Sequence, residues 1–304
     1  MSNIKLIEVQ GSGIPDNSPF FLNEQTSAKA KIFRLMAGGC TLKSQWNDED
    51  YELSRNYFLG SDENLGISFL DNYENDLNLE DYSSYLNQTK FLNKKFYTRF
   101  FDELANAVYA ENKGQHSKAF IFIYRAYECL SYAFPMIYAA RTEDFIGTYS
   151  DLQSWLTPEG KEKNVGELRF HRKFLEKIYK DQAEVSLFLD INITGVDSEK
   201  EKIFFVLTKK IMGWKNEDQY SQGTVEFNKV SISFLEFHTF IVHLRNRFFH
   251  YSNGNQSNIT AAEILDSDYF FSLVNERCLH YISKIFHTVV VLTMPVRESA
   301  EMDG

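Results

Sequence analysis

Three side chains near the end of an apolar stretch could act together in acid–base chemistry. Arg245, Asn246 and His250 lie in the segment Leu-Arg-Asn-Arg-Phe-Phe-His. Histidine titrates near neutral pH and can move a proton to or from a hydroxyl group. Arginine can stabilise negative charge on phosphate oxygens, and asparagine can hold the imidazole or the substrate in register. This set suits cleavage of an RNA phosphodiester with the 2′-hydroxyl as internal nucleophile, a reaction that requires no acidic metal cluster.

The spacing of these residues limits how they can meet on a helix. Asn246 and His250 are one helical turn apart, so a contact between amide and imidazole is expected. Arg245 lies about 140° around the helix from His250. The two heads therefore meet only if the arginine reaches around, if the last turn loosens, or if a second copy of the helix lies opposite.

A helix with an apolar face is predicted to position the motif. Ser233 and Glu236 form the sequence pattern of a capping box, which predicts that the helix begins there, and Gly254 is typical of its end. The apolar residues that share one face are Phe234, Phe237, Ile241, Leu244 and Phe248. We expect this face to pack into a helical bundle.

The motif resembles a known signature. Arg-Asn-x-x-x-His, late in a helical domain, is similar to the R-x(4–6)-H signature of the HEPN superfamily of ribonucleases, in which a polar residue commonly follows the arginine, as Asn246 does here. Arginine and histidine at these spacings also recur by chance, so the asparagine and the helical context carry the specificity. The segment 120–128 also resembles the long first helix of these domains, and the resemblance covers about residues 90–294.

The resemblance implies a fold, an assembly and an activity. It implies an all-α domain that forms a homodimer, in which the two Arg245/His250 pairs face each other across a cleft. It further implies a metal-independent endoribonuclease that leaves 2′,3′-cyclic phosphate ends. Such enzymes act as toxins, in CRISPR-associated systems or in abortive-infection defence against phage. A regulatory partner or antitoxin is a further expectation.

A second group of side chains could bind RNA. Residues 168–180 interleave basic side chains with aromatic ones and contain one acid, Glu176. The candidate RNA contacts are Arg169, Arg172, Lys173 and Lys177 in this strip, together with Arg247 beside the motif. A basic strip with rings is typical of surfaces that bind the phosphate backbone, and a solvated helix face gives the same pattern.

The net charge of −10 belongs to one segment. Residues 47–81 contain eleven acids and one base, Arg55, and this segment accounts for the whole deficit of the chain. An acidic total disfavours a binder whose entire surface is basic, but the remaining residues are balanced. The acidic segment could be a solvated connector, a docking surface for a basic partner, or a phosphate mimic that lies over the RNA cleft.

Hydropathy and turn residues predict a mainly α fold. We expect short strands at 4–9 and 31–36, a polar loop at 142–164, and helices at about 91–110, 117–135, 165–181, 199–212 and 268–293. Hence we predict an HEPN-like helical bundle at 89–296, with a small irregular or α+β region before it at 1–88 and a tail at 297–304. The N-terminal region could be a sensor or regulatory unit.

Neither a metal nor a cofactor is predicted. Cys40, Cys129 and Cys278 are far apart, which argues against disulfides and structural zinc. His238 and His243 lack a third zinc ligand. With no apolar run long enough to cross a membrane, we expect a cytoplasmic protein without a membrane partner.

Two other functions remain open at the level of sequence. The bundle could be a non-catalytic module that dimerises or docks a partner. The chain could also be a nucleotide-binding regulatory protein, with a sensor in residues 1–88 that responds to a phage or small-molecule cue.

Overall fold

The computed structural model describes residues 4–47, 49–71, 73, 77–142, 144–158, 167–179, 188–193, 198–213, 229–249, 258–260, 263–264 and 266–294. These residues form nine α-helices, one short 3₁₀ helix and five strands, so the prediction of a mainly helical chain with a small N-terminal sheet is confirmed. The helices are α1 (Ala28–Ala37), α2 (Leu79–Gln88), α3 (Lys94–Asn112), α4 (His116–Arg141), α5 (Phe145–Leu156), α6 (Glu167–Ile178), α7 (Ser198–Met212), α8 (Phe234–Phe249) and α9 (Ser267–Leu292). The strands are β1 (Ile4–Ile7), β2 (Thr41–Ser44), β3 (Asp50–Glu52), β4 (Phe188–Asn192) and β5 (Lys229–Ser233), and the 3₁₀ helix η1 covers Ile67–Leu70.

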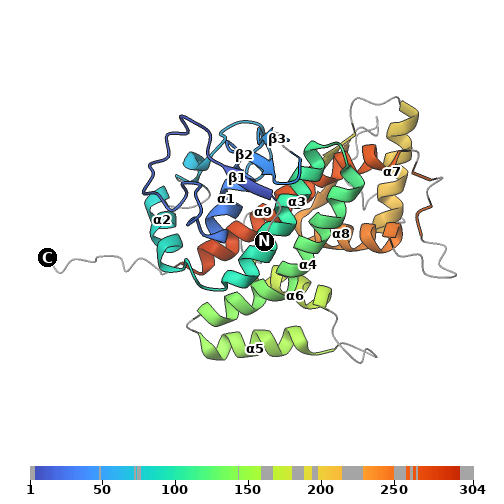
Figure 1. The fold of residues 1–304 in the computed structure, drawn as a ribbon. Helices are drawn as coiled ribbons and strands as arrows, with labels where there is room; N and C mark the ends of the chain where they lie inside the picture. The colour runs from blue at the N-terminus through green and yellow to red at the C-terminus, as the bar shows by residue number, and fades with distance from the viewer. Residues whose placement is uncertain are drawn as a thin grey trace.

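Helix α9 is the central element of the molecule. It begins where the side chain of Asp266 accepts a hydrogen bond from the Tyr269 N–H at 3.0 Å. Its middle and C-terminal turns bury side chains on every face, which is the pattern of a helix enclosed by other elements. Helix α4 packs against both α3 and α9, and Figure 1 shows α5 and α6 at the lower edge and α7 and α8 on the right.

The N-terminal region packs on this central helix. Strands β1, β2 and β3 form an antiparallel sheet in that order, and α1 lies against α3. The ring of Phe33 in α1 contacts Phe286 of α9, with centroids 5.0 Å apart, and also contacts Phe58 at 5.6 Å. Tyr82 of α2 shares a 2.7 Å hydrogen bond with the His287 ring. The two predicted regions, 1–88 and 89–296, therefore share one continuous hydrophobic core.

The prediction of a strand at 31–36 is wrong. These residues belong to α1, whose N-cap Ser27 accepts a hydrogen bond from the Ala30 N–H at 3.2 Å. Ile32, Phe33 and Leu35 are fully buried, as is Met36. A short helix buried on all sides shows no polar face, so its apolar run resembles that of a buried strand.

Two boundaries around α4 also differ from prediction. The helix begins at His116, and the Ser117 N–H donates to the Asp268 carboxylate of α9 at 2.7 Å, so the cap is supplied by a distant element. Pro135 does not end the helix, which continues to Arg141. An internal proline costs about 3 kcal/mol, and the turn that follows it is held by contacts of the Tyr138 ring with Trp155 of α5 and Phe174 of α6.

The predicted polar loop at 142–164 contains α5. Asp144 caps this helix by accepting a hydrogen bond from the Gly147 N–H at 2.8 Å. Trp155 is buried and lies between Phe170 and Phe174 of α6. Helices α5 and α6 therefore form a hairpin held by aromatic contacts.

The acidic segment 47–81 is a folded part of the core. Its apolar side chains Leu53, Tyr57, Phe58, Ile67, Leu70 and Tyr73 are buried. Several of its acids stabilise local structure: Glu49 pairs with Lys113 of α3 at 2.5 Å, Asp62 pairs with Arg55 at 2.7 Å, and Asp81 completes the capping box of α2. The segment is more than a solvated connector, because its ion pairs also reach α9 through Arg55 and Glu276 and α3 through Glu49 and Lys113.

A buried histidine connects α9 to this segment and makes stability depend on pH. The Nδ1–H of His280 donates to the Tyr57 carbonyl oxygen at 2.6 Å, and burial lowers the pKa of His280 to about 4. An unfolded histidine has a pKa of about 6.5, so between these two values the unfolded chain binds a proton that the folded chain does not. The free energy of unfolding is expected to fall as the pH drops from about 6.5 to 4, by up to roughly 3 kcal/mol from this residue.

Urea unfolding at pH 7.5 and pH 4.5 measures this effect. His280→Gln keeps a donor for Tyr57 and should show a smaller loss of stability between the two pH values than the unchanged chain. An identical loss in both proteins would contradict the assignment to His280.

Candidate functional site

The motif helix α8 is anchored on its apolar face. Phe234, Phe237, Ile241 and Leu244 are fully buried and Phe248 is half-buried, as the sequence predicts. The helix begins at Phe234, directly after Ser233, which ends strand β5. One turn in, the Nδ1 atom of His238 lies 2.6 Å from the Tyr127 hydroxyl of α4. These contacts fix the rotation of the helix about its axis.

Arg245 and Asn246 form a pair at the surface of this last turn. Arg245 Nη1 donates to the Asn246 side-chain oxygen at 3.0 Å. The guanidinium group also lies over the ring of Tyr124 in α4, 5.0 Å from its centroid, which is a cation–π geometry. Asn246 is exposed and Arg245 is half-buried. Asn246 and Tyr124 therefore orient the guanidinium group of Arg245 together.

The end of α8 is held by aromatic rings up to its last described residue. Phe249 stacks on Phe120 of α4, with centroids 5.9 Å apart, and Phe248 contacts Phe271 of α9 at 4.9 Å. His250, the predicted acid–base group, follows directly and lies outside the described residues, as does Gly254. The next described residues are 258–260. Here the Ile259 N–H donates to the Arg247 carbonyl oxygen at 2.9 Å.

Arg247 has a structural contact in addition to its predicted role in RNA binding. Its Nη1 donates to the Lys210 carbonyl oxygen at the end of α7. Partial burial lowers the pKa of the guanidinium group from its usual range. Arg247 therefore joins α7 to α8, and part of its donor capacity is already used.

The predicted basic strip lies on α6 and is largely braced by neighbouring elements. Arg172 donates to Glu236 of α8 at 3.0 Å and to Glu176 at 3.0 Å, and these two carboxylates raise the pKa of its guanidinium group against the opposing effect of burial. Lys177 pairs with Asp151 of α5 at 3.3 Å, and Lys173 donates to the Ser154 carbonyl oxygen at 2.9 Å. Arg169 lies on the same helix. These contacts balance part of the positive charge, while RNA binding by the four residues stays a prediction.

Sequence reasoning missed a buried polar cluster under the motif helix. His171 of α6 is fully buried, 5.7 Å from the His238 ring and 5.3 Å from the Tyr127 ring, measured between centroids. Neither ring nitrogen of His171 has a hydrogen-bond partner in the described part of the chain, and burial, with the nearby His238, holds its pKa well below the usual range. The sequence did contain a signal for this burial. His171 lies three residues before Phe174 and seven before Ile178, and this helical spacing places all three on one face of α6.

Among the described residues, no group of three or more His, Cys, Asp or Glu side chains could hold a metal ion. None of the described helices combines the length and apolar character that a membrane crossing requires. Comparison of the chain with protein-family models, with curated proteins and with solved structures finds no match.

Proposed function

We propose that this chain is a metal-independent endoribonuclease of HEPN type, with Arg245 and His250 as the catalytic pair. The observation that carries the proposal is the Arg245–Asn246 pair, which is oriented by Tyr124 at the surface of a firmly anchored helix, five residues before a histidine. An arginine with a purely structural role at a helix C-terminus can be stabilised by the helix dipole alone. This one has a specific side-chain partner and a ring that fix the direction of its guanidinium group.

Each residue has a defined role in the proposed reaction. His250 removes the proton of the 2′-hydroxyl, which attacks the adjacent phosphorus, or protonates the 5′-oxygen that leaves. Arg245 donates to the non-bridging oxygens, where negative charge increases in the transition state. Asn246 holds Arg245 in register through its side-chain oxygen. The products are a 2′,3′-cyclic phosphate and a free 5′-hydroxyl, and neither a metal nor a cofactor takes part.

The test is cleavage of RNA by the purified full chain in the presence of EDTA. The 3′ ends of the fragments should resist labelling until the cyclic phosphate is opened and removed. A matched DNA strand, which lacks the 2′-hydroxyl, should remain intact. Cleavage that requires added magnesium, or cleavage of DNA at a similar rate, would contradict the proposal.

A second copy of the chain is the proposed partner, and the exposed face of α4 is the surface we assign to it. Ile121, Tyr132 and Met136 are 43%, 44% and 56% exposed and share this face with Arg125, whose side chain is 52% exposed and pairs with Glu103 of α3. Large apolar side chains that line up on one exposed helix face are typical of protein interfaces. Tyr124, which holds Arg245, belongs to the same helix, so a two-fold contact along α4 brings the two motifs toward each other.

Substitution within this stripe is expected to change the oligomeric state. Tyr132→Glu and Met136→Glu together place two charges in the apolar contact and should convert a dimer to a monomer at micromolar concentration, as measured by light scattering. Lys95→Glu, a charge change at an exposed position of α3, is the control and should leave the dimer intact. A wild-type monomer, or a double variant that stays dimeric, would contradict the proposed surface.

The second candidate function, a non-catalytic interaction module, is favoured by one observation. The ion pairs of Arg172 and Lys177 occupy basic groups that an RNA-binding surface would leave available. The cleavage assay separates the two functions, because a module cuts RNA under no condition.

A further inference from the structure

The exposed side chains of α4 are spaced symmetrically along the helix. Four long side chains line the middle of its exposed face: Ile121, Arg125, Tyr132 and Met136. Their separations of four, seven and four residues read the same from either end, and the midpoint falls between Glu128 and Cys129. At 100° per residue the four positions lie within about 60° of one another around the helix. Lys118 and Ala139, further out on the same face, are placed equally far from this midpoint.

Such a stripe is complementary to a second copy of itself. In two antiparallel helices related by a two-fold axis, a residue before the midpoint faces the residue equally far after it in the partner, and each contact occurs twice. Ile121 then faces the partner's Met136, and Arg125 faces the partner's Tyr132. A parallel pair places Arg125 against the partner's Arg125, and like charges that meet in an interface oppose association. The spacing and the charge therefore favour the antiparallel direction.

Arg125 is held in place at the surface. Its Nη2 pairs with the Glu103 carboxylate of α3 at 2.6 Å, and the guanidinium carbon lies 6.0 Å from the centroid of the Phe122 ring. The side chain of Glu103 is 9% exposed, whereas that of Arg125 is 52% exposed. A guanidinium group with a fixed direction loses little conformational entropy when a partner covers it.

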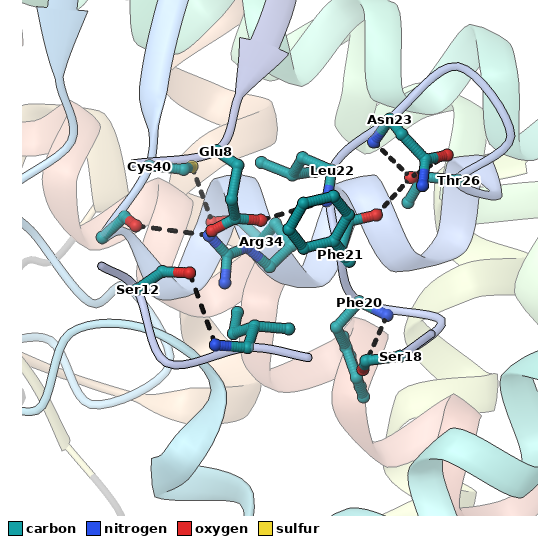
Figure 2. A network of polar contacts seen from close by, with 12 residues as sticks. Glu8, Ser12, Ser18, Phe20, Phe21, Leu22, Asn23, Thr26, Arg34 and Cys40 are labelled. Carbon is teal, nitrogen blue, oxygen red and sulfur yellow. Dashed lines mark hydrogen bonds and ion pairs between the residues drawn. The ribbon is translucent and has the colours of Figure 1, made fainter. Parts of the chain in front are cut away.

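The core contains an arginine–glutamate pair of the opposite kind. Arg34 of α1 pairs with Glu8 at 2.6 Å and also donates to the Gly39 carbonyl oxygen at 3.3 Å (Figure 2), and its side chain is 1% exposed. That pair is enclosed by the fold of its own chain. The Arg125–Glu103 pair has the same length but keeps half of its cation at the surface, where a second molecule can reach it.

The midpoint of the stripe allows two helices to approach. Cys129 is 4% exposed and Glu128 is half-buried. Burial raises the pKa of the Cys129 thiol, and the charges of Arg99, Glu103, Arg125 and Glu128 act on it in opposite directions, so these four groups lie around the midpoint. They comprise two cations and two anions. Two midpoints can therefore meet without net repulsion, and Glu128 offers a carboxylate to the partner's cation.

We propose that two copies of the chain pack α4 against α4 in antiparallel direction about this midpoint, with Arg125 over the ring of the partner's Tyr132. The partner's Glu128 lies one helical turn from that ring, so the cation has a ring and a carboxylate as neighbours. The proposal rests on the assignment of α4 as the dimer surface, and it adds the direction and the register of the contact.

This arrangement fixes where the two motifs lie. Tyr124, which orients Arg245, lies about 90° around α4 from the middle of the stripe. A two-fold axis perpendicular to two antiparallel helices keeps both such flanks on the same side of the pair. Tyr124 and the partner's Tyr124 are nine residues apart across the midpoint, or about 14 Å along the helices. Both Arg245 side chains therefore open onto one face of the dimer.

Disulfide cross-linking of the full chain tests the direction. Ile121→Cys and Met136→Cys are made in a Cys129→Ser background and are oxidised separately and as a mixture. The mixture should form a cross-linked dimer, because the two positions face each other. Neither variant should cross-link alone, since identical positions are about 22 Å apart along the helices and a disulfide requires Cα atoms within about 7 Å. Cross-linking of either variant alone, or none in the mixture while light scattering shows a dimer, overturns the proposal.

Sedimentation equilibrium tests the contact of Arg125 with Tyr132. Arg125→Ala and Tyr132→Leu should each raise the dissociation constant of the dimer about three- to thirty-fold, and the double variant should be little weaker than the weaker single variant. Tyr132→Phe keeps the ring and is the matched control, which should dimerise as the unchanged chain does. Losses that add in the double variant overturn the contact. An unchanged chain that is monomeric overturns the α4 surface together with this proposal, while RNA cleavage, measured separately, tests the catalytic assignment.

Discussion

Replacement of His250 by alanine is expected to lower the rate of RNA cleavage about 10²- to 10⁴-fold, because the transition state loses its proton-transfer group. Arg245→Ala should lower the rate about 10²- to 10³-fold, because the developing negative charge on the phosphate loses its donor. The double variant should be scarcely slower than the worse single variant, since residues that act as a unit have non-additive effects. Single-turnover cleavage of a labelled RNA gives these rates.

Two controls separate catalysis from folding. Arg99→Ala removes an arginine from an exposed position of α3 and should leave the rate unchanged. Asn246→Ala removes the acceptor of Arg245 but leaves the Tyr124 ring, so an intermediate loss is expected. If both His250→Ala and Arg245→Ala cut RNA at the wild-type rate, the catalytic assignment is wrong. If the unchanged protein cuts no RNA, the interaction module becomes the better explanation.

Phe58→Ala is expected to destabilise the whole molecule by about 3–5 kcal/mol, the usual cost of removing a fully buried ring. Phe58 is fully buried in the acidic segment, where it stacks on Phe33 and Phe69 and contacts the His287 ring of α9. Because these contacts join the N-terminal region to the bundle, both should unfold together in one transition. Urea unfolding followed by circular dichroism and by aromatic fluorescence measures the loss of stability and shows whether the two probes report one transition.

The control for this prediction lies in the same segment. Glu63→Gln changes an exposed acid and should alter the free energy of unfolding by less than about 0.5 kcal/mol. Two separate transitions in the Phe58→Ala variant would show that residues 1–88 form an independent domain, as the sequence boundary suggests. The result also bears on the acidic segment: because the segment is part of the core, its proposed role as a phosphate mimic is better tested by neutralising exposed acids than by deletion.

Several helices could be predicted from sequence because their apolar residues recur at helical spacing or their ends carry local signals. Helix α7 begins and ends within one residue of its predicted bounds, and so does α9. The errors occur where a distant element decides the outcome. Asp268 caps α4 across 151 residues, and the rings of α6 hold α5 in place of a loop. No window of neighbouring residues contains that information.

The candidate site was predictable in its residue types but not in its surroundings. The spacing of Arg245 and Asn246 placed both side chains in the last turns of α8, and the structure agrees. The partner of Arg245 could not be predicted, because Tyr124 lies on another helix and comes more than one hundred residues earlier. The ion pairs of Arg172 and Lys177 were missed for the same reason, since Glu236 and Asp151 belong to α8 and α5. RNA contact by the basic strip therefore awaits measurement.

The central position of α9 determines when the protein can fold during its synthesis. Phe33 and Phe58, near the start of the chain, and α4, in its middle, all require α9 to complete their packing. Neither the N-terminal sheet nor the bundle has a closed core until residues 267–292 have left the ribosome. The nascent chain therefore exposes the apolar surfaces that pack on α9 until this helix has been added.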